Sequence, residues 1–281
     1  MISLIKLFTP VKSIDTHEAK NFMAEHEEGS YTLLDVRQPA EYETEHIPGA
    51  KLLPLPGLKD GLSQLDPQKP VIAYCAIGGR SFAAAQLLSG LGFEKVYNLQ
   101  GGIKAWQGQK AAGPQELNLE LVRGDETAPE IIALAYGMEM GLGIFYRDMI
   151  KKSEDPDLRE LLSKLADIET RHKKKLLDLL AEIDSPVKDA EAYEADIGPN
   201  ILEGGFQLTD FMKKNESFLR SVQGVLDLAM MLETQALDLY LRFAEKITHT
   251  QTRDALFTIA DEEKAHLNSL GGLLEQKIQT V

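Results

Sequence analysis

The 281-residue chain contains a single cysteine, Cys75. One thiol excludes a disulfide within the chain, a CxxC redox pair, and a four-cysteine zinc or rubredoxin-type iron site. A lone cysteine is either an inert core residue or a reactive thiol, and the residues around it decide between the two.

Long apolar runs are also lacking. No uninterrupted stretch approaches the ~20 apolar residues that a membrane-spanning helix needs. The opening MISLIKLFTP holds too short an apolar stretch for a signal peptide, and it has no small-residue cleavage site. These absences predict a cytoplasmic protein with no membrane partner.

An excess of basic residues is absent too, and the net charge is −14. Residues 1–112 contain 11 basic and 12 acidic residues, whereas residues 113–281 contain 19 and 32. An acidic second half argues against a nucleic acid or an anionic membrane as partner. It also supplies carboxylates, which hard metal ions prefer as ligands, although an acidic solvent-exposed surface accounts for most of these charges equally well.

The two halves differ in their hydrophobic periodicity. Within residues 1–110, short apolar runs at 31–36, 71–74 and 95–99 predict buried strands, and a helical pattern covers 81–91. Alternating strands and helices predict an α/β domain with a mainly parallel sheet and helices on its faces.

Beyond this domain the strand signal disappears. Residues 111–126 are expected to form a linker, and residues 127–281 an all-α four-helix bundle. The segment 184–215 is too broken by proline and glycine for one helix. It would form the long crossover connection of a bundle whose neighbouring helices are not all antiparallel. The long amphipathic helices are predicted at 127–152, 157–184, 216–247 and 251–277.

Cys75 directly follows the predicted strand 71–74 and opens the run CAIGGR, after which a helix is predicted from Ser81. In a loop between a strand's end and a helix's start, backbone N–H groups point inward at the positive end of the helix dipole. They would stabilise a thiolate or persulfide anion, so the pKa of the thiol should fall. Arg80 could brace the loop or bind an anionic substrate. The loop residues expected to bind substrate are Ala76, Ile77, Gly78 and Gly79.

Four sequence blocks punctuate the first half: LLDVR at 33–37, HIPGA at 46–50, CAIGGRS at 75–81 and NLQGGIKAW at 98–106. With these blocks in this order, residues 10–108 resemble the rhodanese family. The resemblance implies that Cys75 accepts a sulfane sulfur from a small-molecule donor such as thiosulfate. The sulfur would pass to a thiol or another thiophilic acceptor outside the chain, or stay on Cys75, because no second cysteine can resolve a persulfide.

The length of the cysteine loop distinguishes two branches of that family. The sulfurtransferases are similar to this chain in having four residues between the cysteine and the arginine, whereas the phosphatase relatives have five. The resemblance therefore implies sulfur transfer. Among the other residues of these blocks, Asp35, Arg37 and Glu41 are expected to form a buried ion-pair and capping network. His46 is expected to be a turn or packing residue.

The second half repeats itself at an offset of 94 residues, as duplicated helical units do. Glu139 corresponds to Glu233, and Tyr146 corresponds to Tyr240. A Glu-x-x-His motif recurs at the same offset, which predicts two equivalent helical hairpins around a pseudo-two-fold axis. The two motifs are Glu169 with His172 and Glu263 with His266.

The glutamates and histidines of this repeat fall on the apolar seams of the predicted helices, at the alternating three- and four-residue spacing of a bundle interface. Four carboxylates and two imidazoles would therefore point into an apolar core. Burying the carboxylates together is unfavourable unless they are protonated or bind cations. Two divalent ions balance four carboxylates, and two neutral histidines complete the ligand set. This is the ligand pattern of ferritin-like di-iron and di-manganese bundles.

With this pattern, the second half resembles the ferritin-like superfamily, and rubrerythrin in particular. The resemblance implies two iron ions, although manganese or a mixed-metal centre would use the same ligands. It also implies a homodimer. The implied roles are terminal ligands for Glu139 and Glu233, bridging ligands for Glu169 and Glu263, and one metal each for His172 and His266.

Two features depart from the rubrerythrin pattern. Rubrerythrins carry a second glutamate one turn after the third-helix ligand, where this chain has Ala236. They also usually carry a rubredoxin module, which a single cysteine cannot supply. Any electrons would therefore come from an external electron-donor protein.

Tyrosines and glycines surround the predicted ligands. Tyr146 and Tyr240, two turns beyond the glutamates of the first and third helices, are expected to donate hydrogen bonds to the carboxylates. Alternatively, they are core aromatics with a satisfied hydroxyl. Three glycines near the first-helix glutamate suggest room beside the metals for oxygen, peroxide or a sulfur species. They are Gly137, Gly141 and Gly143.

Together these features predict a bifunctional enzyme. A sulfurtransferase acting through a Cys75 persulfide would be joined to a di-iron bundle with redox activity toward oxygen or peroxide. In the alternative, the bundle binds or senses iron, and the rhodanese-like domain delivers sulfur or docks a partner.

Overall fold

The computed structural model describes residues 10–197 and 201–278. The chain divides into two compact units, Met1–Leu117 and Asn118–Val281. The outermost residues of the two predicted domains, 1–9 and 279–281, lie outside the described residues.

The first unit is built on a five-stranded sheet in the order β1-β5-β4-β2-β3, with every neighbouring pair parallel. The predicted α/β class with a mainly parallel sheet is therefore confirmed. Two strands, β1 and β3, were not predicted, because three and two residues are too short to produce an apolar run. The strands are β1 Lys12–Ile14, β2 Thr32–Asp35, β3 Lys51–Leu52, β4 Val71–Tyr74 and β5 Val96–Leu99.

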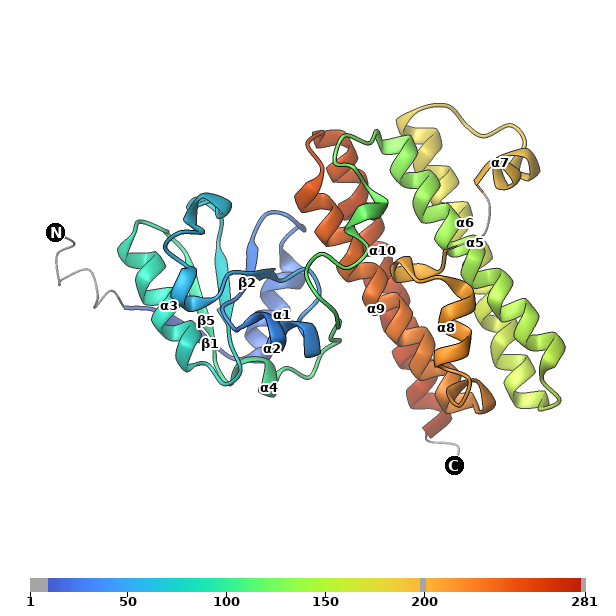
Figure 1. Ribbon diagram of the computed structural model, residues 1–281, viewed down its shortest axis with the longest axis horizontal. Coiled ribbons are helices and arrows are strands. Elements are labelled where there is room, and N and C mark those ends of the chain that lie inside the picture. Colours follow the sequence, from blue (N-terminus) through green and yellow to red (C-terminus); the bar gives the residue numbers. More distant parts are fainter. Residues whose placement is uncertain (1–9, 198–200, 279–281) are drawn as a thin grey trace. The chain divides into compact units, whose positions relative to one another are not determined.

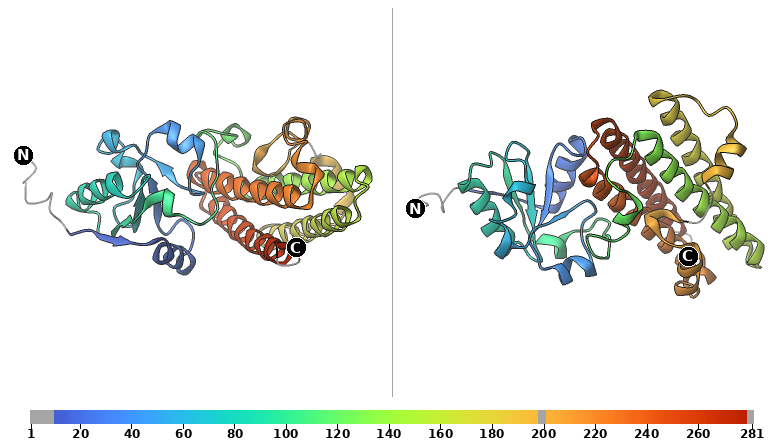
Figure 2. Two further views of the ribbon diagram at one scale, coloured as in Figure 1. Left: turned by 90° about the horizontal axis from the view of Figure 1, so that it is seen from below. Right: turned by 45° about the horizontal axis from the view of Figure 1, so that its top comes forward.

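Helices cover both faces of this sheet (Figures 1 and 2). The side chains of β2 and β4 alternate between two apolar clusters. Leu34 and Ala73 pack in the cluster that contains α3, whereas Leu33 and Ile72 pack in the cluster that contains residues of α1, α2 and α4. The helices are α1 Thr16–Glu25, α2 Pro39–Thr44, α3 Gly79–Gly90 and α4 Gly102–Ala105, with 3-10 turns at Leu55–Gly57 and Leu62–Gln64.

The second unit is a four-helix bundle made of two hairpins (Figures 1 and 2). Helix α5 packs along α6, and α9 packs along α10. The hairpins meet through α5 with α10 and through α6 with α9. The crossover connection between α6 and α9 carries two short helices, α7 and α8, in place of one long helix. The helices are α5 Ala128–Lys152, α6 Pro156–Ile183, α7 Ala190–Ile197, α8 Leu208–Lys214, α9 Val222–Lys246 and α10 Thr250–Ile278, with 3-10 turns η4 Leu119–Leu121, η5 Glu203–Gly205 and η6 Phe218–Arg220.

Local signals set the ends of the bundle helices. Thr127 and Glu130 form a capping box at the start of α5. The third long helix, predicted from residue 216, begins at Val222 instead. The preceding residues turn in η6, and Ser221 Oγ then accepts a hydrogen bond from the Gly224 amide at 3.1 Å.

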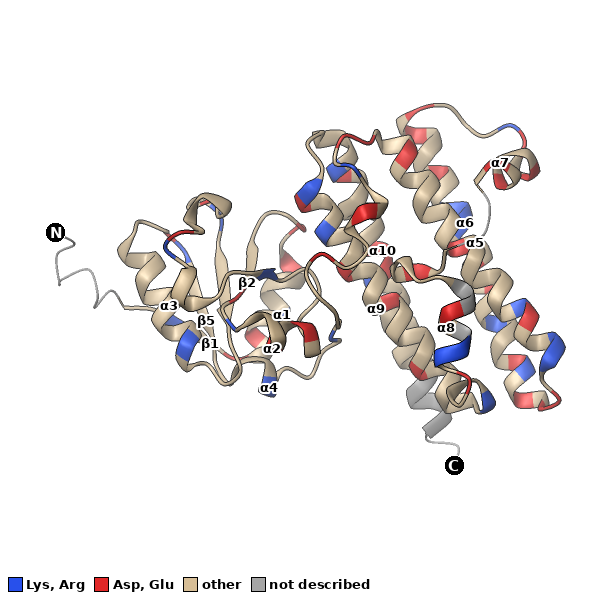
Figure 3. Ribbon diagram, viewed as in Figure 1, with Lys and Arg blue, Asp and Glu red and all other residues tan. Residues whose placement is uncertain are grey.

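Helix α5 is the one described helix that is long and apolar enough to cross a membrane by length and composition. No such helix was predicted, because Glu139 and other polar residues interrupt its apolar runs. In the structure 72% of its apolar window is buried within the bundle, so α5 serves as a core helix. Both units carry acidic and basic residues, and acidic residues are spread along the bundle helices (Figure 3).

Candidate functional site

The cysteine loop joins β4 to α3. Helix α3 begins at Gly79, two residues before the predicted start, so Arg80 lies in its first turn. Gly78 caps the helix with a φ of +103°, a conformation that favours glycine. Cys75 itself is only 1% exposed. The loop therefore holds a buried sulfur at the N-terminal end of a helix.

Hydrogen-bond donors surround that sulfur. The Gly78 amide donates to Cys75 Sγ at 3.1 Å, and the Ser81 hydroxyl lies 3.5 Å from Sγ. Burial raises the pKa of the Cys75 thiol, but hydrogen bonds from the Ser81 hydroxyl and from loop amides outweigh this effect. The pKa is lowered overall, in the predicted direction.

A second glycine-rich turn supports the loop from behind. The amide of Ile103 donates to Cys75 O at 2.9 Å, and the amide of Lys104 donates to Ala76 O at 3.1 Å. Gly102 makes this approach possible, because a Cβ there would lie 2.2 Å from Cys75 O. The block at 98–106 therefore fixes the backbone of the cysteine loop.

Arg80 is paired with Glu41 through two hydrogen bonds, Nη1 to Oε2 at 2.7 Å and Nη2 to Oε1 at 2.6 Å. The guanidinium lowers the pKa of Glu41 to about 2. The predicted network of three residues is therefore split, because Arg37 pairs with Asp35 in a separate buried bridge of 2.6 Å. Arg80 thus links the first turn of α3 to Glu41 of α2, and its two predicted roles stay predictions.

His46 packs as expected. Its ring stacks on Tyr42 with 3.7 Å between centroids, and its Nδ1 lies 2.9 Å from Tyr42 O. Beside the cysteine loop, the Ser81 hydroxyl donates to Asn98 Oδ1 at 2.7 Å, and Asn98 Nδ2 donates to Ser13 Oγ at 3.1 Å. The single hydroxyl proton of Ser81 is therefore shared between Asn98 Oδ1 and the more distant Cys75 Sγ.

In the second unit, the four long helices bring all six predicted metal ligands into the bundle core. Each of these side chains is buried, with at most 6% exposure. Helix α5 contributes one, α6 two, α9 one and α10 two. The residues are Glu139, Glu169, His172, Glu233, Glu263 and His266.

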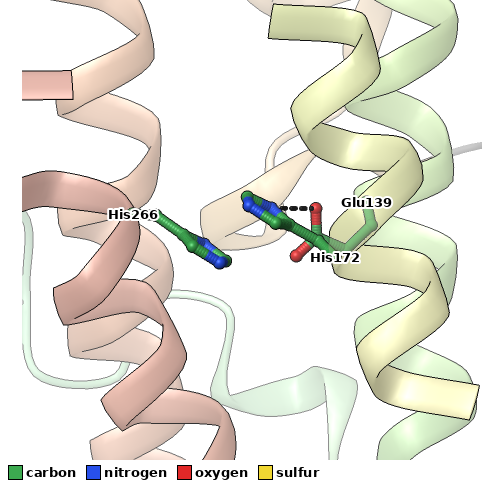
Figure 4. A group of neighbouring side chains, drawn as sticks. All are labelled: Glu139, His172 and His266. Carbon is green, nitrogen blue, oxygen red and sulfur yellow. Dashed lines mark hydrogen bonds and ion pairs between the residues drawn. The ribbon is translucent and has the colours of Figure 1, made fainter. Parts of the chain in front are cut away.

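The two hairpins place these groups alike. His172 Nδ1 lies 3.0 Å from Glu169 Oε2 and 3.3 Å from Glu139 Oε2. In the other hairpin, His266 Nδ1 lies at 3.2 Å and 3.3 Å from the corresponding glutamates. The two imidazole rings stack face to face, with centroids 3.2 Å apart and an angle of 3° between planes (Figure 4).

Burial dominates the electrostatics of the cluster. It raises the pKa of Glu139 to about 7 and that of Glu169 to about 8, with repulsion from nearby carboxylates adding to the effect. The pKa values of Glu233 and Glu263 are also raised well above the usual value, again mainly by burial. Burial lowers the pKa of His172, which favours the neutral imidazole that metals bind.

A fifth carboxylate, Glu203, joins the cluster from the crossover connection. It is 0% exposed and lies in the short turn η5. A carboxylate oxygen of Glu203 lies within 4.8 Å of ligand atoms of Glu139, Glu169 and His172. Glu203 was not predicted, because it belongs neither to the 94-residue repeat nor to a helical seam. The only local signal is the pair Gly204-Gly205 that follows it.

The residues present fit a two-metal centre. Oxygen donors with two nitrogens suit iron or manganese, and five buried carboxylates need cations for charge balance. The candidate ligand groups are Glu139, Glu169, His172 and Glu203; Glu233, Glu263 and His266; and Glu139 with both histidines.

Tyr240 differs from the first expectation, whereas the expected hydrogen bond of Tyr146 stays a prediction. The hydroxyl of Tyr240 donates to Met138 Sδ at 3.6 Å and not to a carboxylate, which corresponds to the alternative of a satisfied core aromatic. Tyr146 is buried at 1% exposure beside the cluster, where burial and the charges of Glu169 and Glu233 raise its pKa.

The glycines of α5 do not provide one common space. A Cβ at Gly141 would lie 2.3 Å from Ile201 O, so the crossover backbone occupies this flank. A Cβ at Gly143 would lie 3.4 Å from Glu169 Cβ. Gly137 lines a cavity of about 430 Å³ together with residues of α7. The hypothesis of room beside the metals is therefore wrong for Gly141, whose side is filled.

A smaller hollow leads to the cluster between α6 and α10. Its volume is about 60 Å³, and its lining includes Glu139 and both histidines of the cluster. At its outer end Lys175 of α6 forms an ion pair with Glu262 of α10, and both side chains are partly exposed. The hollow therefore connects the buried ligands with the surface.

Two family models match the chain. A model described as Rhodanese-like domain matches residues 18–109, and one described as Rubrerythrin matches residues 130–274. The uncharacterized protein YqhL of Bacillus subtilis is 46% identical over 77 residues, which are 27% of this chain and 61% of YqhL. Rhodanese-like/PpiC domain-containing protein 12 of Arabidopsis thaliana is 38% identical over 107 residues, 34% of each chain. The chain thus spans less than two thirds of these curated relatives.

Solved structures match the first unit. A rhodanese-like domain protein from Staphylococcus aureus is 32% identical with a TM-score of 0.33, covering 35% of this chain and 94% of that one. A rhodanese-related protein from Thermoplasma volcanium is 30% identical with a TM-score of 0.32, covering 36% and 97%. Since the rubrerythrin match extends over more than half of the residues, including the bundle's six predicted ligands, the chain belongs to the rubrerythrin family and carries a rhodanese-like domain in front of its bundle.

Proposed function

We propose that this chain is a two-site enzyme, a sulfurtransferase at Cys75 joined to a redox-active di-iron bundle. The observation that carries the first activity is the position of the Cys75 sulfur. It accepts the Gly78 amide at 3.1 Å within a loop that lowers the pKa of the thiol. Donors that stabilise a thiolate also suit the anion of a persulfide.

The sulfur-transfer reaction balances with one cysteine. The Cys75 thiolate attacks the outer sulfur of thiosulfate; a new S–S bond forms, the S–S bond of thiosulfate breaks, and sulfite leaves with the electron pair. An acceptor thiolate then attacks the terminal sulfur of the persulfide. The acceptor leaves as a persulfide, and Cys75 returns to the thiolate. Neither step requires an outside oxidant or a resolving cysteine.

Arg80 has a supporting role in this proposal. Its side chain is 37% exposed although it is paired with Glu41, and it lies near enough to Cys75 for the thiolate to raise its pKa. It would hold the loop rigid and attract an anionic donor to its entrance. The backbone from Ala76 to Gly79 would contact the donor, with Ile77, 68% exposed, at the rim.

For the bundle, we propose that the six predicted ligand side chains hold two iron ions. When bound, the ions would supply the redox chemistry for reducing oxygen or peroxide. The protein residues neutralise the ionic charge, exclude bulk water and limit access. The hollow of about 60 Å³ between α6 and α10 admits a molecule the size of a few waters. This favours a small oxidant over a bulky substrate.

The remaining features of the proposal concern organisation. The sulfurtransferase domain would cover residues 1–110, the linker 111–126 and the metal bundle 127–281. The protein would be a cytoplasmic homodimer. An external protein would donate the electrons, because the chain's one cysteine belongs to the sulfurtransferase loop.

Two measurements on the metal-loaded protein test this function. Incubation with thiosulfate alone should release sulfite and leave one added sulfur on Cys75, detectable by mass spectrometry. Addition of a thiol should remove this sulfur and allow sulfite release to continue. Rapid mixing of the ferrous protein with peroxide, in the presence of a reductant, should give repeated turnovers. A protein that neither forms the persulfide nor turns over would contradict the proposal.

Iron binding or sensing is the second candidate, with the first unit delivering sulfur or docking a partner. The absence of cysteines from the second unit favours it, since that unit has no cysteine-based electron relay. The two candidates differ in stoichiometry. A binding protein would oxidise its iron once per site, whereas an enzyme would continue as long as reductant is supplied.

A further inference from the structure

We propose that Glu203 is an additional metal ligand, supplied by the crossover connection to the metal position of the α5–α6 hairpin. This inference rests on the proposed dimetal function of the bundle. It makes the two metal positions unequal, although the helices that carry the other ligands are related by an internal repeat.

The Glu203 carboxylate is buried without a hydrogen-bond partner among the described residues. Glu203 is 0% exposed, and within the part of the chain that the structure describes neither carboxylate oxygen has a hydrogen-bond partner. By contrast, Glu139 and Glu233 each contact a histidine nitrogen at 3.3 Å. A buried carboxylate is strongly unfavourable unless it is paired, protonated or bound to a cation. Glu203 is therefore expected to bind a cation.

The turn that carries Glu203 contains two glycines. Gly204 and Gly205 both have positive φ, +70° and +82°, which lets the chain reverse within a few residues. The Leu202 amide donates to Phe206 O at 2.8 Å, and Asn118 Nδ2 donates to Gly204 O at 2.6 Å. These backbone groups of the turn are thus satisfied, in contrast to the carboxylate that the turn carries.

The turn is also anchored against the bundle. Leu202, beside Glu203, is 0% exposed and packs in the same apolar cluster as Leu142 of α5. The backbone of Ile201 passes so close to α5 that only glycine fits at Gly141, where a Cβ would meet Ile201 O at 2.3 Å. Such packing fixes the carboxylate in the core and prevents it from turning toward solvent.

The cluster is asymmetric between the two hairpins. A Glu203 oxygen lies within 4.8 Å of ligand atoms of Glu139, Glu169 and His172. The corresponding group in the α9–α10 hairpin consists of Glu233, Glu263 and His266. One position is therefore offered three carboxylates and the other two. A site with more carboxylates should bind the first cation more tightly and favour the higher oxidation state of iron.

The direct test compares Glu203→Gln with the wild type. The substitution keeps the size of the side chain and removes its charge. We expect the two ions to bind with affinities closer together, with the tighter site weakened at least about 10-fold, as second-sphere or ligand changes do at metal sites. Competition of ferrous iron against a chromophoric chelator measures both affinities. Mössbauer spectra should show two unequal irons in the wild type and a changed pair in the variant.

Glu194→Gln is the matched control. Glu194 lies on the same connection, in α7, but its carboxylate accepts a hydrogen bond from Tyr136 at 2.8 Å and pairs with Lys173. This variant should bind iron like the wild type. If Glu203→Gln also does so, with unchanged Mössbauer parameters, the assignment of Glu203 is wrong. If the wild type itself binds no metal, the proposed dimetal function fails as a whole.

A second measurement covers the case in which Glu203→Gln alters folding. Removing an unpartnered buried carboxylate should raise the thermal midpoint of the metal-free protein, and it should reduce the further rise that iron produces. A purely structural glutamate would shift both midpoints equally. Anomalous scattering from iron in crystals of the wild type provides an independent check, since a metal peak bonded to other residues but not to Glu203 would overturn the inference.

Discussion

The two units bury anionic groups in opposite surroundings. In the first, one sulfur faces donors that the chain itself provides, the Gly78 amide and the Ser81 hydroxyl. In the second, five carboxylates face one another, and burial and repulsion raise their pKa values. In the cysteine loop, the protein's own donors stabilise the negative charge of the sulfur. In the bundle core, the negative charges of the carboxylates are balanced only when cations bind.

This difference predicts different dependences on solution conditions. A site stabilised by fixed dipoles should be insensitive to chelators and sensitive to the loss of single hydrogen bonds. A site stabilised by cations should respond strongly to chelators. The two responses should also be independent if the sites act separately.

Replacing Cys75 with serine should have the largest effect on activity. Loss of the nucleophile should lower sulfur transfer by at least about 1000-fold and abolish the persulfide. Sulfite release from thiosulfate is the measurement. The iron content and the thermal midpoint of the bundle should not change. A variant that loses iron together with sulfur transfer would show that the two sites are coupled.

Removing the metals should have the next largest effect, confined to the second unit. One ligand at about 100 times its dissociation constant stabilises a protein by about 2.7 kcal/mol. For two ions and a domain of this size, chelation should lower the thermal midpoint of the bundle by about 10–20 °C. Differential scanning calorimetry with and without chelator measures it. The first unit should unfold at an unchanged temperature, and an unchanged bundle transition would argue for a purely structural bundle.

Removing the hydrogen bond from Ser81 to the Cys75 sulfur should have a smaller effect, which is measured as a change in the pH dependence of Cys75 alkylation. Because the pKa of Cys75 lies below its usual value of 9.0, more thiolate is present at neutral pH than in an ordinary thiol. Alkylation by iodoacetamide should therefore reach half its maximal rate below pH 9. Ser81→Ala removes a donor and should move this midpoint upward, slowing alkylation at pH 7 about 2- to 10-fold.

The lowered pKa of Cys75 also makes the stability of the fold depend on pH. A thiol with a lowered pKa in the folded state contributes stability above the unfolded pKa, and this contribution is lost as the pH falls through the folded pKa. Ser89→Ala, at the other end of α3, serves as the control because Ser89 has no described bond to the sulfur. If both variants shift the alkylation midpoint equally, the hydroxyl of Ser81 does not stabilise the thiolate.

Most of the candidate site could be predicted from the sequence, because residues spaced three or four apart lie on the same face of a regular helix. Glu169 and His172 are three residues apart on an apolar seam, so their meeting in the core follows from helical geometry. The same reasoning fails for Glu203. Its position depends on a turn with two glycines in positive φ and on close passage beside Gly141, which are tertiary features. Periodicity carries no information about such a segment.

The first unit shows the same division. The buried strand β4 and its following loop were predictable, because a continuous apolar run and a glycine pair are local signals. The partner of Arg80 was not, since Glu41 lies 39 residues away in the chain and could equally have paired with Arg37. Likewise, the bond from Tyr240 to Met138 depends on packing between α9 and α5.

Breaking the ion pair at the entrance to the metal cluster should have the smallest effect, which is a change in the rate of iron removal. Lys175 and Glu262 pair across the outer end of the hollow between α6 and α10. Exposed ion pairs contribute up to about 1 kcal/mol, so Lys175→Ala should speed iron removal by a chelator by at most about 5-fold, with little change in affinity. Lys174→Ala removes a neighbouring pair with Asp178, on the same helix but outside the lining of the hollow. It should leave the rate unchanged. Equal rates in both variants would mean that small molecules reach the cluster by another route, and the cavity beside Gly137 would then be the place to look.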